Sequence, residues 1–148
     1  MKKPIIYLLL ALVLILGAGC DLFPFFNNGT IYFYEMAGEN DDPSSYRLKH
    51  RDDGYTIIMS RGRGGFILEK EQAEDLIDNT VFSLTLDGAP LQLIGEMTVD
   101  ELGNTGWHVV QNFSLQELSV GFYTLVGVTQ FPGLEEESRR NEVALEIY

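Results

Sequence analysis

The stretch that decides the fold is Leu118-Ser119-Val120-Gly121-Phe122-Tyr123, which opens a strand-like run that continues to Phe131. β-Branched and aromatic residues dominate this run, a composition typical of β-strands. A charged segment, 132–141, follows it. Residues 142–148 then alternate apolar and polar side chains with a period of two, as a half-buried strand does. The end of the chain therefore predicts two strands joined by a charged hairpin loop.

Upstream of this hairpin, the sequence indicates further short strands separated by turn signals. Arg51-Asp52-Asp53-Gly54 is a hairpin signal that joins the runs 46–50 and 55–61. Residues 69–79 instead space their apolar side chains as one face of a helix, which predicts one short surface helix. The remaining predicted strands are 30–36, 81–86, 91–98 and 107–113. About seven or eight short strands predict a single all-β sandwich over residues 30–148.

One motif sharpens this fold class. The pattern Leu118-x-x-Gly121-x-Tyr123 resembles the tyrosine corner of immunoglobulin-like and fibronectin-type-III-like sandwiches, and the resemblance spans residues 81–148. It implies that Leu118 plugs the core, that Gly121 makes the turn, and that the Tyr123 hydroxyl bonds to backbone upstream. It also implies an immunoglobulin-like antiparallel β-sandwich. The disulfide of antibody domains cannot form here, because Cys20 is the only cysteine.

The first twenty residues have the layout of a bacterial secretion signal. Lys2 and Lys3 precede the apolar run 5–16, which has signal-peptide length and is too short to span a membrane. The segment Gly17-Ala18-Gly19-Cys20 resembles the lipobox of bacterial lipoproteins, with Leu16 one place earlier than in the family pattern. The resemblance implies a signal-peptide helix, removal of residues 1–19, and diacylglyceryl and further acyl chains such as palmitate on Cys20. An ordinary secreted protein, cut near the same place, is the alternative.

Residues 20–29 form a short tether that contains Phe23, Phe25 and Phe26. Aromatic rings suit the membrane interface, so these three could dip into it; they could equally cover the base of the domain. Asp21 resembles the inner-membrane retention signal of enterobacteria-like lipoproteins, although the side of attachment stays open. We expect a lipid-anchored protein of the bacterial cell envelope that faces the periplasm or the cell exterior.

The charge of the chain excludes one class of partner. The formal net charge is −12, and removal of Lys2 and Lys3 with the signal peptide leaves 8 basic against 22 acidic residues. Nucleic-acid affinity rests on Lys and Arg contacts to phosphate, so we expect no nucleic-acid partner. The acidic surface is most simply a solubility feature.

The most distinctive loop is Arg61-Gly62-Arg63-Gly64-Gly65, since it is basic in an acidic protein. Two guanidinium groups and exposed backbone amides suit a small anion or a carboxylate. The alternative is a glycine-rich bend in which Arg61 and Arg63 pair with nearby carboxylates. The sequence leaves both interpretations open.

Other candidate chemistry is sparse. His50 and His108 lack a second histidine or a cysteine at zinc-ligand spacing, so we expect no metal site and no cofactor. The acidic segments 39–42 and 52–53 could hold calcium, but neither follows the spacing of an EF-hand. No nucleophile–base pair is visible, so we expect no catalysis.

Together these patterns predict a lipid-anchored envelope protein with a structural role or a role in binding a protein or glycan. The alternative is a lipoprotein that binds a small anion or Ca²⁺ through Arg61 and Arg63 or the acidic loops. A hydrolytic enzyme is the more remote alternative.

Overall fold

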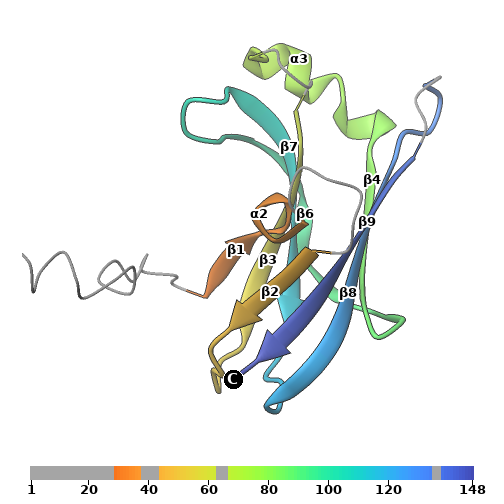
Figure 1. Ribbon diagram of the computed structural model, residues 1–148. Helices are drawn as coiled ribbons and strands as arrows, with labels where there is room; N and C mark the ends of the chain where they lie inside the picture. The colour runs from red at the N-terminus through yellow and green to blue at the C-terminus, as the bar shows by residue number, and fades with distance from the viewer. Residues whose placement is uncertain (1–28, 38–43, 63–66, 135–137) are drawn as a thin grey trace, which may run out of the picture.

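The computed structural model describes residues 29–37, 44–62, 67–134 and 138–148, which form an all-β sandwich of two sheets (Figure 1). Its elements are β1 (Thr30–Tyr32), α2 (Phe33–Ala37), β2 (Ser44–Leu48), β3 (Tyr55–Arg61), α3 (Lys70–Glu74), the 3₁₀ helix η1 (Ile77–Asn79), β4 (Val81–Leu86), β5 (Ala89–Pro90), β6 (Gln92–Glu101), β7 (Trp107–Leu115), β8 (Gly121–Gln130) and β9 (Arg139–Ile147). The predicted signal-peptide helix, Cys20 and the tether up to residue 28 lie outside the described residues. Over the described ranges, no helix has the length and apolar character needed to cross a membrane.

The strands divide into sheets of four and five. The order is β1-β3-β7-β6 in the first sheet and β2-β9-β8-β4-β5 in the second. Most neighbouring strands are antiparallel, whereas β1 runs parallel to β3 and β2 runs parallel to β9. The chain thus places its first strand in one sheet and its second strand in the other, with α2 following directly after β1.

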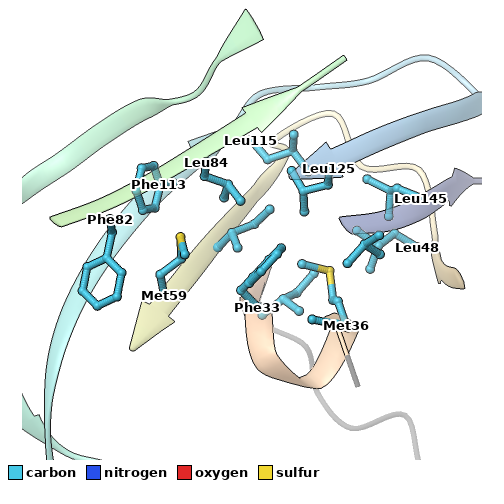
Figure 2. Close-up of a cluster of buried hydrophobic side chains, with 14 of the residues drawn as sticks. Phe33, Met36, Leu48, Met59, Phe82, Leu84, Phe113, Leu115, Leu125 and Leu145 are labelled. Carbon is cyan, nitrogen blue, oxygen red and sulfur yellow. The ribbon is translucent and has the colours of Figure 1, made fainter. Parts of the chain in front are cut away.

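The core lies between the sheets and is built from alternate residues of the strands. Val143, Leu145 and Ile147 of β9 are buried, as their period of two predicts. They pack with side chains of β3, β4, β7 and β8 in one cluster, to which α2 contributes Phe33 and Met36 (Figure 2). Because Cys20 is the only cysteine in the sequence, no disulfide within the chain can form, and packing of this cluster supplies the stability of the domain.

The predicted bounds of 55–61 and 81–86 are those of β3 and β4, and 107–113 lies within β7. The predicted strand 30–36 is wrong in its second half, because the chain turns into α2 at Phe33. Phe33, Met36 and Ala37 have the i, i+3, i+4 spacing of a helix face, and all three are buried. Burial of that face outweighs the strand propensity of the aromatic residues.

The predicted hairpin between 46–50 and 55–61 is also wrong. The turn itself forms, since the Gly54 amide donates to the Arg51 carbonyl over 3.2 Å. However, β2 pairs with β9 and β3 pairs with β1 and β7, so this turn connects the two sheets. The predicted helix over 69–79 is broken into α3 and η1, with Asp75 and Leu76 between them.

Candidate functional site

One end of the sandwich holds a pocket of about 180 Å³. It opens where β3 and β8 end and β9 begins, with α2 on its inner side. We call this region the pocket end. The described residues that line it are Phe33, Tyr34, Met59, Ser60, Arg61, Gly62, Gly127, Thr129, Phe131, Arg139 and Asn141.

Arg61, the last residue of β3, is a buried cation on the wall of this pocket. Its side chain points inward because Ile57, Met59 and Arg61 share the inner face of the strand, and only 8% of the residue is exposed. Its Nη1 donates to the Asn79 carbonyl over 2.9 Å and to Thr80 Oγ1 over 2.7 Å. These bonds fix the guanidinium against the end of η1.

Phe131 has two guanidinium groups close to its ring. The Arg61 Cζ is 4.2 Å from the centre of the Phe131 ring, and the Arg139 Cζ is 5.6 Å from it. Cations over an aromatic face are attracted to its negative potential. This arrangement holds two positive groups at one pocket, although the chain as a whole has a formal charge of −12.

Gly127 of β8 lies where the Phe33 ring of α2 meets the second sheet. A Cβ at this position would overlap the Phe33 ring. The absence of a side chain therefore lets α2 pack closely against β8 beside the pocket.

The opposite end of the domain, which we call the tether end, comprises Gly29, the turn 51–54 and the loop 116–120. Gly29 lies against Arg51 and Gly54, and its carbonyl accepts the Thr56 amide over 2.6 Å. Gly54 lies against the backbone of Leu115. Its φ is +66°, a value that residues with a side chain adopt only with strain. Gly29, the first described residue, therefore lies in close contact with the turn 51–54 where the chain enters the sandwich.

Arg51 and Asp53 form a bidentate ion pair at the tether end. Arg51 Nε donates to Asp53 Oδ1 over 2.9 Å, and Nη2 donates to Oδ2 over 2.6 Å. The bond from Arg51 lowers the pKa of the Asp53 carboxyl, and the same bond raises the pKa of Arg51. Asp53 is therefore engaged by a side chain rather than available as a calcium ligand.

His50 lies close to two carboxylates at the same end. Its Nδ1 is 3.8 Å from Asp52 Oδ1, and its Nε2 is 3.5 Å from Glu117 Oε1. One ligand atom from each of His50, Asp52 and Glu117 lies within 4.8 Å of the others, so these three residues could hold a metal ion. Asp52 is almost fully exposed, and exposed acidic groups of this kind are common without a metal ion. His108 lies elsewhere, with Nε2 3.0 Å from Thr105 Oγ1.

Tyr123 has the hydrogen bond that defines a tyrosine corner. Its hydroxyl donates to the Ser119 carbonyl over 2.9 Å, four residues upstream. Leu118 is partly buried against the core, and Gly121 is the first residue of β8. The bond ties the loop 116–120 to the second sheet.

Of the two arginines singled out by the sequence, Arg61 lies in the pocket, whereas Arg63 and the acidic segment 39–42 lie outside the described residues. Sequence reasoning missed Arg139, Phe131 and Asn141. The sequence contained a signal for two of them. Arg139 and Asn141 continue, with a period of two, the series of buried residues in β9, so they lie on the same face of that strand.

Comparisons with known proteins add little. A scan against protein-family models and a search of curated proteins found no match. The crystal structure of the cysteine protease inhibitor EhICP2 from Entamoeba histolytica is similar with a TM-score of 0.42 and 12% identity, over 80% of this chain and 94% of that one. The solution structure of amebosin is similar with a TM-score of 0.33 and 11% identity, over 80% of this chain and 96% of that one. Likenesses this distant support no conclusion about function.

Proposed function

We propose that this chain is a lipid-anchored protein of the bacterial envelope that presents a non-catalytic, immunoglobulin-like binding domain. The observation that carries the proposal is the separation of the two ends of the sandwich. Gly29, where the tether of the sequence meets the domain, bonds to Thr56 at the start of β3. Arg61, on the pocket wall, is the last residue of the same strand. At about 3.3 Å per residue, the two ends of β3 are roughly 20 Å apart.

The strand order supports the immunoglobulin-like assignment. In that fold the sheets read A-B-E-D and G-F-C-C′ when strands are lettered along the chain. The orders β1-β3-β7-β6 and β9-β8-β4-β5 match these, with β2 as an additional strand beside β9. In this lettering β8 corresponds to strand F, which carries the tyrosine corner in that fold. The bond from Tyr123 to Ser119 lies at the start of β8, as the assignment requires.

Exposed apolar residues at the tether end support its placement beside the membrane. Val120, in the loop 116–120, is 69% exposed, and Phe122, just after that loop in β8, is 83% exposed. If Phe23, Phe25 and Phe26 occupy the membrane interface, only residues 27 and 28 separate them from Gly29. Three residue steps span at most about 10 Å, so the tether end would lie close to the bilayer.

The pocket favours the small-anion alternative as the binding activity of this domain. Arg61 and Arg139 both line it, and the guanidinium group of each lies close to the Phe131 ring. Calcium binding gains no similar support, because Asp53 is engaged by Arg51 and the carboxylates near His50 are exposed.

Metabolic labelling with an alkyne analogue of palmitate tests the anchor. The full-length chain, expressed in a bacterium, is expected to take up the label and to sediment with membranes. Cys20→Ala is expected to lose the label and to move to the soluble fraction after signal cleavage. Gly19→Ala keeps a small residue before the cysteine and is the matched control, expected to behave as the parent chain. A cleaved Cys20→Ala protein that still sediments with membranes would contradict the anchor.

A further inference from the structure

Three side chains at the tether end have the atoms of a metal site. His50 and Asp52 belong to the connection between β2 and β3, and Glu117 lies in the loop 116–120 between β7 and β8. One ligand atom of each lies within 4.8 Å of the others. We propose that these three side chains bind one divalent transition-metal ion of the zinc type. The site is separate from the pocket and from the lipid anchor, and it adds a function to those proposed above.

The imidazole of His50 decides the class of ion. Zinc binds imidazole nitrogen together with carboxylate oxygen, and three protein ligands can leave a position for water. Calcium and magnesium instead take oxygen ligands, so the histidine would contribute nothing to their binding. Among the described residues, Asp52 and Glu117 have no arginine or lysine partner, whereas Asp53 is engaged by Arg51. Two carboxylates are therefore available to balance the charge of a divalent ion.

The spacing of the ligand atoms is close to the spacing that zinc requires. Zinc binds nitrogen and oxygen at about 2.0–2.2 Å, so two ligands of a tetrahedral ion lie roughly 3.3 Å apart. Ring nitrogens of His50 are 3.8 Å from Asp52 Oδ1 and 3.5 Å from Glu117 Oε1. The Asp52 side chain is 94% exposed and that of Glu117 is 58% exposed, so both can turn toward a shared ion without disturbing the core.

The backbone that carries the three ligands is held by hydrogen bonds. The His50 amide donates to the Tyr148 carbonyl over 2.7 Å, and the Tyr123 hydroxyl holds the loop 116–120 through the Ser119 carbonyl. Each of the two connections passes from one sheet to the other. An ion bound to both connections would therefore stabilise the folded domain. At about ten times the Kd, it is expected to raise the Tm by roughly 4 °C.

The test is an NMR titration of the full chain with zinc chloride, in zwitterionic detergent, without a histidine tag and after treatment with EDTA. Zinc is expected to shift the ring signals of His50 and the backbone amides of Asp52 and Glu117 saturably. Half-saturation is expected below about 1 mM, the weak limit of dedicated metal sites in extracellular modules. Calcium at the same concentration is expected to leave the His50 ring signals unchanged, because it does not favour imidazole.

The chain offers a matched control for each of two ligands. His50→Gln removes the nitrogen ligand and is expected to weaken zinc binding at least roughly tenfold. His108→Gln makes the same change at the second histidine and is expected to leave the Kd unchanged. Glu117→Gln is also expected to weaken binding roughly tenfold. Glu101→Gln makes the same change in charge at an exposed position of β6, where Glu101 pairs with Trp107, and is expected to have no effect.

A free thiol is itself a zinc ligand, so the titration is repeated with Cys20→Ala, for which the same Kd is expected. Three results would overturn the proposal: zinc shifts that do not saturate, loss of zinc binding in Cys20→Ala, or equal effects of Glu117→Gln and Glu101→Gln. The last result would mean that zinc is attracted to the acidic surface as a whole. Palmitate labelling of Cys20 does not depend on any of these results, so the metal site and the anchor can fail separately.

Discussion

The two ends of the sandwich both depend on a glycine, but they use it differently. At the tether end, Gly54 lies against the Leu115 carbonyl, so backbone packs directly on backbone. At the pocket end, Gly127 lies against the Phe33 ring, so backbone packs on a side chain that borders a cavity. A side chain at position 54 would therefore collide with backbone, whereas one at position 127 would collide with a side chain. This difference suits the proposed arrangement, in which the domain is held at one end and binds at the other.

The largest effect is expected from Gly54→Ala. The new Cβ would overlap the Leu115 carbonyl, and alanine would be strained at φ +66°. The two costs together are expected to lower the free energy of unfolding by about 3 kcal/mol or more. Urea denaturation of the full chain in detergent, followed by tryptophan fluorescence from Trp107, measures the change.

Gly127→Ala is the comparison variant for this measurement. Its Cβ would overlap the Phe33 ring, which can shift toward the pocket, so the expected loss is only about 1–2 kcal/mol. A loss for Gly127→Ala as large as that for Gly54→Ala would mean that both ends are equally rigid, and the contrast between them would fail.

A smaller effect is expected from Tyr123→Phe, which tests how the loop of the tether end is held. The variant removes the hydroxyl that donates to the Ser119 carbonyl and is expected to reduce stability by about 1 kcal/mol. Tyr148→Phe is the control, because it removes a hydroxyl from a side chain that is 53% exposed. The same denaturation experiment compares them, and equal stabilities for the two variants would show that the corner bond contributes nothing.

Much of the fold was predictable because alternation of buried side chains is a local property of the sequence. β3 and β4 have their predicted bounds, and the inward residues of β9 are those that the period of two selects. Which strands pair with each other was not predictable in this way, because it depends on residues that are far apart in the sequence. The Asp-Gly turn at 53–54 forms as its chemistry requires, but the distant strand β9 supplies the partner of β2.

The pocket was predictable only in part. Arg61 stood out because it lies in a basic, glycine-rich stretch of an acidic chain. Arg139 stood next to Arg140 beside a run of glutamates, so its charge indicated a solvent-exposed loop. The meeting of Arg61, Phe131 and Arg139 depends on how the sheets pack, and no spacing in the sequence records that contact.

The most direct test of the account is the distance of each end from the membrane. A fluorophore can be placed on Ser119→Cys at the tether end or on Ser138→Cys at the pocket end, in the lipidated full chain on vesicles that contain nitroxide-labelled lipid. The ends of β8, which connects these regions, are roughly 30 Å apart at about 3.3 Å per residue. The account predicts strong quenching at position 119 and little at position 138. Equal quenching, or stronger quenching at 138, would contradict it.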